Sequence, residues 1–285
     1  RLEEPDTFKK VLKSRLDCGF SYAEARTAAI EHLLPGAGKM LSSPNNILAQ
    51  EYVQRIIERN YPLRITPIKR TGGGHHSGSS GAFAGAGWIR NTVRNEGLSD
   101  TVRTVMPPEA LSMLGTEISR GRCILSLDVF WRILRTVLMR DGPSRLSRFA
   151  EMREGIENLL TASAARAGSF EEFINLCTSR RYPRSKIQRF ACHSLMGFDH
   201  RANRKAQRTG PPYIRVLGWD IKGQEILKEM RTASRLPVVT RPNGRPGTYQ
   251  RMIADLEYRA TSIWENLVQS PELFSESGNL PVRPV

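Results

Sequence analysis

Apolar residues recur at spacings of three and four along most of this 285-residue chain, and this periodicity constrains its fold more than any other feature. A helix buries one stripe of its surface, so such spacing predicts helices. A serine answered by a glutamate three residues later, at Ser169 and Glu172, adds a helix start with a capping box. In the second part of the chain the predicted helices cover residues 124–139, 146–165, 183–197 and 247–268.

The part of the chain before residue 107 mixes helical and strand-like patterns. Residues 6–33 are expected to form one or two helices, and Ser43 followed by Pro44 is typical of a helix start, where proline costs no hydrogen bond. Residues 63–68 are partly alternating and β-branched, which predicts a strand. A helix, a strand and a loop in this order indicate the last unit of an α/β sheet. The helix after Ser43 is expected to bury Leu48, Tyr52, Val53, Ile56 and Ile57.

Two further segments are expected to be strands, residues 213–217 and 236–240, and they flank a helix predicted over 223–233. This order predicts a small βαβ unit within the helical part. Pro107 and Pro108 mark the expected domain boundary, which gives domains of residues 1–106 and 107–285.

The formal charge of +15, from 43 Lys and Arg against 28 Asp and Glu, indicates a polyanionic partner. No apolar run approaches the roughly 18–20 residues of a membrane span, and no basic helix carries the apolar face that a membrane surface binds. Nucleic acid is therefore favoured over a membrane. Four dispersed cysteines without a C-x-x-C pair fit a reducing, cytoplasmic location, and His75 and His76 lack further ligands, so no metal site is expected.

The densest cationic segment covers residues 180–208, where Asp199 is the only acid. Lys186, Arg189 and His193 are expected to share the outward face of one helix. Tyr182 is placed to stack on a base, as aromatic side chains do in RNA-binding proteins. The alternative is an ordinary solvated face. The residues predicted to bind RNA are Arg180, Arg181, Tyr182, Arg184, Lys186, Arg189, Arg204, Lys205 and Arg208.

Two pairs of polar residues are placed to meet a nucleotide. Asn45 and Asn46 lie in the first turn of a predicted helix, where unpaired N–H groups favour phosphate, although both amides can equally cap that helix. Lys69 and Arg70 follow the predicted strand, and ligands of α/β sheets gather at the carboxyl ends of strands. The alternative for this second pair is two solvated charges.

A series of short motifs resembles the bacterial tRNA(Met) cytidine acetate ligase family. The resemblance extends over nearly the whole chain, in order and at compatible spacing. The motifs that carry it are Leu41-Ser-Ser-Pro-Asn-Asn-Ile-Leu48, Thr66-Pro-Ile-Lys-Arg70, Pro107-Pro-Glu-Ala110, Glu154-Gly-Ile-Glu-Asn158, Arg181-Tyr182, Ile187-Gln-Arg189, Tyr213-Ile-Arg-Val-Leu-Gly218, Leu236-Pro-Val-Val239 and Arg259-Ala-Thr261.

This resemblance implies an enzyme that uses ATP to convert acetate into acetyl-adenylate and then acetylates the wobble cytidine of elongator tRNA(Met). It implies an α/β, mainly helical fold, with the C-terminal part of a Rossmann-like nucleotidylyltransferase sheet before an α-rich RNA-binding domain. Magnesium would be held through the phosphates of ATP, and no catalytic residue is assigned. The residues it places at ATP are Asn45, Asn46, Lys69, Arg70, Thr71 and Arg90.

The chain departs from the family pattern at two places. None of its five histidines forms the H-x-G-H motif that the family carries near its start, so this chain alone is expected to be inactive or incomplete. Gly85 and Gly87 stand where the family has hydroxyl residues before Ile-Arg, which weakens phosphate binding or repurposes the loop. A non-catalytic RNA-binding protein derived from this scaffold is the main alternative, and a nucleotidylyltransferase acting on a small molecule is a third.

Overall fold

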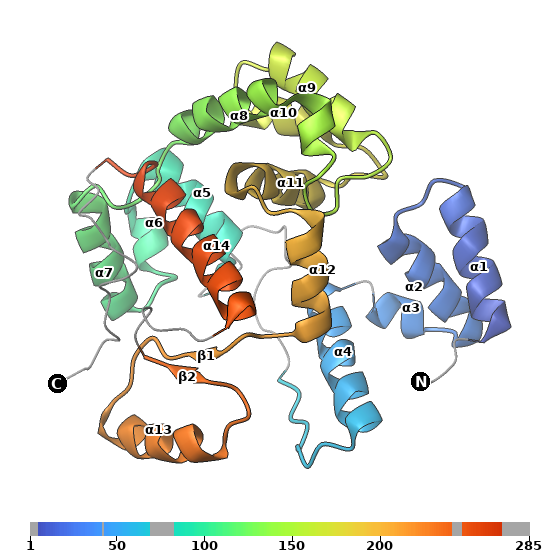
Figure 1. Cartoon of the computed structure of the whole chain (residues 1–285), viewed down its shortest axis with the longest axis horizontal. Coiled ribbons are helices and arrows are strands. Elements are labelled where there is room, and N and C mark those ends of the chain that lie inside the picture. The colour runs from blue at the N-terminus through green and yellow to red at the C-terminus, as the bar shows by residue number, and fades with distance from the viewer. Residues whose placement is uncertain (1–4, 42, 69–82, 241–246, 270–285) are drawn as a thin grey trace. The chain divides into compact units, whose positions relative to one another are not determined.

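The computed structural model describes residues 5–41, 43–68, 83–240 and 247–269 (Figure 1). The chain divides into two compact units. The first unit comprises residues 1–71 with 177–187, and the second comprises 72–176 with 188–285. The predicted division into functional domains of residues 1–106 and 107–285 concerns function and not compactness, and it stays a prediction. No helix in the described ranges is long and apolar enough to cross a membrane.

The first unit is helical, and its first two helices pack against each other. Its helices are α1 (Asp6–Asp17), α2 (Tyr22–Leu33), α3 (Ala37–Met40) and α4 (Pro44–Arg59). The prediction of one or two helices over 6–33 is confirmed, with Phe8, Ala25 and Ala29 buried. Ser21 begins α2 with a complete capping box, in which its hydroxyl accepts the N–H of Glu24 and the Glu24 carboxylate accepts the N–H of Ser21.

Two expectations for this unit are wrong. The apolar stripe of α4 is not buried, since Leu48, Tyr52 and Ile57 are exposed by 53%, 63% and 66%. Residues 63–68 form no strand. A strand requires hydrogen bonds to a neighbouring strand, and these residues have no such partner in the described part of the chain. In the described part of the chain, the only sheet lies elsewhere.

The second unit is mainly helical, as the periodicity predicted. Its helices are α5 (Ala86–Glu96), α6 (Asp100–Arg103), α7 (Pro108–Ser119), α8 (Asp128–Leu146), α9 (Ile156–Arg166), α10 (Phe170–Cys177), α11 (Arg184–Met196), α12 (His200–Thr209), α13 (Ile221–Ala233) and α14 (Thr248–Glu265). The first residues of α11 and the last of α10 belong to the segment 177–187 of the first unit.

The predicted βαβ unit is confirmed, with shorter strands than expected. Strand β1 (Ile214–Arg215) pairs in parallel with β2 (Val238–Val239), and α13 connects them (Figure 1). Ile214 lies opposite Val238 and Arg215 opposite Val239. Asp220 caps α13 by accepting the N–H of Gly223 at 2.6 Å.

The core of the second unit lies between α8, α9 and α10. Leu134, Leu138 and Phe173 are fully buried, and the rings of Trp131 and Phe173 lie 5.1 Å apart. The hydroxyl of Ser169 accepts the N–H of Glu172, which confirms the predicted start of α10. The Glu172 carboxylate, however, accepts the N–H of Gly168 instead of closing a capping box.

The helix predicted over 146–165 is wrong in its first part. Gly142 and Pro143 kink α8, which ends at Leu146, and α9 begins only at Ile156. Glu151, Glu154 and Gly155 between them adopt positive φ angles of 63°, 63° and 81°. A right-handed helix cannot pass through such positions, so residues 147–155 form an irregular loop.

Candidate nucleotide and nucleic-acid sites

The asparagines predicted to meet ATP lie in the first turn of α4, as expected. Both are exposed, but Asn46 already donates from its side-chain amide to the carbonyl of Met40 at 2.7 Å. Asn46 thus joins α3 to α4, whereas Asn45 makes no such bond in the described structure. Ser43 precedes α4 as its N-cap residue without a side-chain capping bond. Asn45 is the better placed of the two to contact a ligand.

Of the other residues predicted to contact the nucleotide, the structure describes only Arg90. Lys69, Arg70 and Thr71 lie outside the described residues. Arg90 is exposed on α5, one turn from the start of that helix. Gly85 is its N-cap residue, and a Cβ atom built at Gly85 or Gly87 meets nothing within 4 Å. Space therefore does not require glycine at either position.

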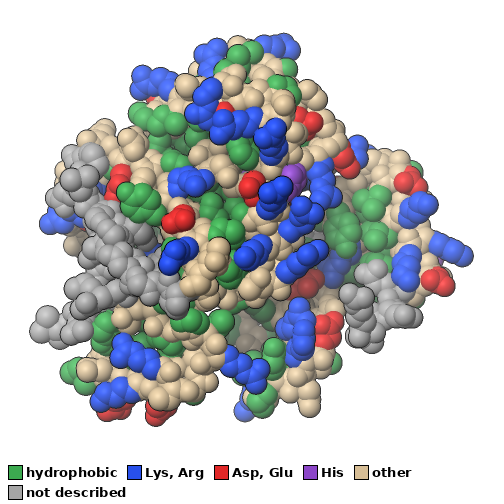
Figure 2. Space-filling view, in the orientation of Figure 1, with side chains coloured by type: hydrophobic (Ala, Val, Ile, Leu, Met, Phe, Trp, Pro, Cys, Tyr) green, Lys and Arg blue, Asp and Glu red, His purple; other side chains and the backbone are tan. Residues whose placement is uncertain are grey.

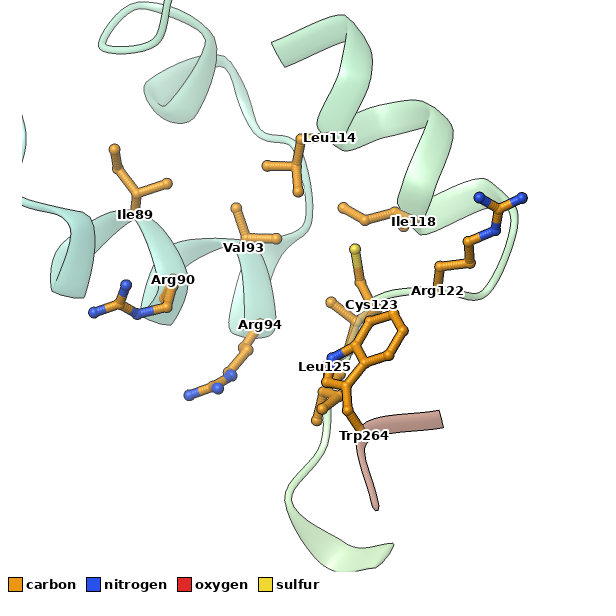
Figure 3. Close-up of a pocket in the computed structure, with 11 residues that line it drawn as sticks. Ile89, Arg90, Val93, Arg94, Leu114, Ile118, Arg122, Cys123, Leu125 and Trp264 are labelled. Carbon is orange, nitrogen blue, oxygen red and sulfur yellow. The ribbon is translucent and has the colours of Figure 1, made fainter. Parts of the chain in front are cut away.

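Arg90 and Arg94 border a hollow of about 310 Å³ in the second unit (Figure 3). Its wall is mainly apolar, and α5 contributes Ile89 and Val93 to it. Burial raises the pKa of the Cys123 thiol, and the Glu117 carboxylate raises it further. Cys123 is therefore a neutral thiol near neutral pH and a poor nucleophile. The remaining lining residues are Leu114, Ile118, Arg122, Ile124, Leu125 and Trp264.

The first part of the predicted RNA footprint, residues 180–186, lies in the first unit. The guanidinium of Arg180 lies 3.7 Å from the centroid of the Phe20 ring, so this residue packs against the turn between α1 and α2. The Lys186 ammonium lies 5.0 Å from the Tyr182 ring centroid. Tyr182 is half-buried. Arg181 and Arg184 are exposed.

The second part of the footprint lies in the second unit and contains its clearest cationic surface. Asp199 caps α12 by accepting the N–H of Ala202 at 2.7 Å. Exposed cations then follow at i, i+3, i+4 and i+7, which places them on one helix face. We call this set the α12 stripe, and its members are Arg201, Arg204, Lys205 and Arg208. Figure 2 shows Lys and Arg side chains gathered on this region of the visible surface.

Members of the α12 stripe have no ion pair in the described structure. Lys205 alone has a ring contact, with its ammonium 5.7 Å from the Tyr249 centroid. Cations without carboxylate partners retain their attraction for phosphate. Arg148, which the sequence did not single out, is exposed at the base of the stripe, where its carbonyl accepts the N–H of His200 at 3.1 Å.

Two side chains of α11 differ from the expectation of an outward cationic face. His193 is only 8% exposed, and its Nδ1 is hydrogen-bonded to the carbonyl of Ala150 at 3.0 Å, so its predicted outward position is wrong. The carbonyl of a packed loop satisfies the buried ring, which sequence spacing alone does not reveal. Arg189 is exposed as expected but forms an ion pair with Glu151 at 2.9 Å.

The mainly helical architecture with its small parallel sheet agrees with a nucleotidyltransferase-like fold. A family model described as HIGH Nucleotidyl Transferase matches residues 1–278, so the chain belongs to that family.

Among curated proteins, the chain is similar to enzymes named tRNA(Met) cytidine acetate ligase, which confirms the resemblance inferred from the motifs. The protein from Syntrophomonas wolfei is 28% identical over 293 residues, covering 99% of this chain and 70% of that protein. The protein from Acetivibrio thermocellus is 29% identical over 246 residues, covering 84% of this chain and 59% of that protein. The protein from Thermoanaerobacter sp. X514 is 32% identical, with the same two coverages.

Solved structures of a protein named TmcAL are also similar to this chain. The apo crystal structure of Thermotoga maritima TmcAL matches with a TM-score of 0.88 and 26% identity, covering 99% of this chain and 71% of that one. The same protein bound to alpha-thio ATP matches with a TM-score of 0.84. The chain thus spans between 59% and 70% of the length of these three curated relatives.

Proposed function

We propose that this chain belongs to an ATP-dependent ligase that forms N4-acetylcytidine at the wobble position of elongator tRNA(Met). The observation that carries this proposal is the similarity to tRNA(Met) cytidine acetate ligases over 99% of the chain. An ATP analogue bound by a structural relative of 26% identity supports the use of ATP. The α12 stripe supplies a surface suited to an RNA backbone.

The proposed reaction has two steps. Acetate attacks the α-phosphorus of ATP, which forms acetyl-adenylate and releases pyrophosphate. The exocyclic N4 amine of cytidine then attacks the acetyl carbon, AMP leaves, and the amine loses a proton. In this chain, Asn45 and Arg90 are the described residues proposed to contact the nucleotide, together with Lys69, Arg70 and Thr71 from outside the described ranges. Magnesium would enter with the phosphates of ATP.

Several side chains are proposed to hold the RNA. The α12 stripe and Arg148 in the second unit are exposed and basic, as electrostatic binding of a backbone requires, whereas Arg189 is exposed but paired with Glu151. In the first unit, Arg181, Arg184 and Lys186 add positive charge, whereas Arg180 serves packing as well. These contacts position the RNA and do not by themselves read its sequence.

One assay tests the ligase activity. The chain is incubated with ATP, labelled acetate and tRNA(Met), alone and joined to an upstream segment that carries H-x-G-H. Label on the wobble cytidine in the longer protein only is the expected result, because the chain contains no H-x-G-H motif. Absence of label in both proteins despite tight tRNA binding would contradict the proposal and favour a non-catalytic RNA-binding role.

A further inference from the structure

The loop between α8 and α9 holds two glutamates in a conformation that favours glycine. Glu151 and Glu154 both have φ angles of 63°, in the left-handed region where a Cβ atom is strained. Such strained positions persist where the surrounding structure fixes them, and they gather at functional sites.

The loop is anchored to the end of α11 and the start of α12. The N–H of Ala150 donates to the carbonyl of Phe198 at 2.8 Å, and the carbonyl of Ala150 is hydrogen-bonded to the buried ring of His193. Phe149 also forms a β-bridge with Asp199, the residue that caps α12. Glu151 thus lies two residues after Phe149, which the β-bridge joins to Asp199, the cap of α12.

Glu151 meets Arg189 in a geometry that uses only part of each side chain. The Nε and Nη2 atoms of Arg189 both donate to the same carboxylate oxygen, Oε2, at 3.1 and 2.9 Å. The second oxygen, Oε1, and the Nη1 group have no partner in the part of the chain that the structure describes. The two side chains are 35% and 50% exposed, so these free groups are accessible.

The pair therefore leaves one carboxylate oxygen and the Nη1 donors available, and it carries little net charge. A neutral pair attracts phosphate less than the bare cations of the α12 stripe do. It is instead complementary to a base edge that offers one donor beside acceptors. The Watson–Crick edge of cytosine has this order, with the N4 amine followed by N3 and O2, and single-stranded RNA exposes such edges to proteins. Carboxylates accept from cytosine N4 elsewhere in nucleic-acid recognition.

We propose that the Glu151–Arg189 pair reads the Watson–Crick edge of an unpaired cytosine while the α12 stripe holds the neighbouring backbone. This inference rests on the proposed tRNA function. Glu151 Oε1 accepts from the N4 amine, and Arg189 Nη1 donates to N3 or O2. Uracil places a carbonyl oxygen where cytosine has its amine, so it meets the carboxylate with two acceptors facing each other.

The test compares two anticodon-arm hairpins that differ only in having cytosine or uracil at the wobble position. Equilibrium binding is measured for the wild-type chain, Glu151→Gln, Glu151→Gly and, as a matched control, Arg208→Gln. The wild type should prefer cytosine about tenfold, since one such base contact discriminates by roughly 1–3 kcal/mol. Glu151→Gln should reduce this preference towards one, because its amide can donate to the uracil carbonyl.

Arg208→Gln should weaken both hairpins equally and lower the salt dependence. Glu151→Gly fits the positive φ angle, keeps the loop folded, and should lose the preference in the same way. Equal binding of both hairpins by the wild type, or an unchanged preference in both Glu151 variants, would overturn the base-reading role while leaving RNA binding intact. Failure of the wild type to bind either hairpin would overturn the proposed tRNA function and this role together.

Discussion

The guanidinium of Arg180 lies 3.7 Å from the centroid of the Phe20 ring, and that of Arg15 lies 5.3 Å from the same centroid. One aromatic ring thus joins α1, the start of α2 and the segment 177–187, which is distant in sequence. Arg180 was predicted as an RNA contact from charge alone. Its position indicates that it contributes to the stability of the first unit.

Removing this contact should destabilise the first unit. Arg180→Gln and Phe20→Leu, combined in a double-mutant cycle, should show a coupling of about 0.5–1 kcal/mol, as exposed cation–π pairs do. Urea unfolding followed by circular dichroism provides the measurement. Arg181→Gln, which lies one residue away, is the matched control for loss of charge. A coupling free energy of zero would show that the contact contributes nothing.

The capping box of α2 should make the titration of Glu24 depend on Ser21. Hydrogen bonds from the hydroxyl and backbone N–H of Ser21 hold the pKa of Glu24 below its ordinary value. Because the folded pKa is lowered, this stabilisation is present above the unfolded pKa and is lost as pH falls through the folded pKa. Ser21→Ala should raise the pKa of Glu24, measured by NMR of the carboxyl carbon. An unchanged pKa would contradict the assigned cause.

Cys123 should be alkylated slowly. Burial raises the pKa of its thiol, and Glu117 adds to this effect, so little thiolate is present near neutral pH. Iodoacetamide should modify the exposed Cys18 before Cys123, as followed by mass spectrometry of peptides. Glu117→Gln should lower the pKa of Cys123 and speed its alkylation alone. Equal acceleration at Cys18 would instead indicate a general loosening of the fold.

Restoring hydroxyl groups at the start of α5 should strengthen nucleotide binding. Neither Gly85 nor Gly87 has a neighbour within 4 Å of an added Cβ atom, so Gly85→Thr and Gly87→Ser fit the backbone. Hydrogen bonds to charged groups contribute about 1.5–3 kcal/mol each, so ATP affinity should rise at least about tenfold in the double variant. Isothermal titration calorimetry measures this, with Gly87→Ala as the control for helix propensity. Arg90→Ala should lower the affinity.

The helical regions and the βαβ unit followed from sequence because their signals are local. Apolar spacing predicted α1, α2 and α14, and β-branched residues around 214 and 238 predicted the two strands. The strand at 63–68 failed because pairing depends on a neighbour that no local pattern specifies. The prediction that α4 buries its apolar stripe was wrong for a similar reason. A periodic stripe shows that a helix can bury one face, but it does not show which segment covers that face.

The candidate RNA surface was predictable only in part. Charge density located the α12 stripe, because Asp199 is the only acid in the sequence from 180 to 208. The predicted outward position of His193 was wrong, because its ring is buried and hydrogen-bonded to a loop carbonyl. Charge density also gave no indication of Glu151, whose role depends on a left-handed backbone and on Arg189, 38 residues further along the chain. Such contacts are set by packing between segments, which sequence spacing does not encode.

Salt dependence of tRNA(Met) binding tests the account most directly. If about six phosphates are neutralised, the logarithm of the association constant should fall against the logarithm of salt concentration with a slope of about −5. Replacing Arg204, Lys205 and Arg208 together by glutamine should make this slope shallower by about 2–3, while leaving the thermal unfolding unchanged. A slope near zero for the wild type, or an unchanged slope in the triple variant, would contradict a cationic surface on α12 that holds tRNA.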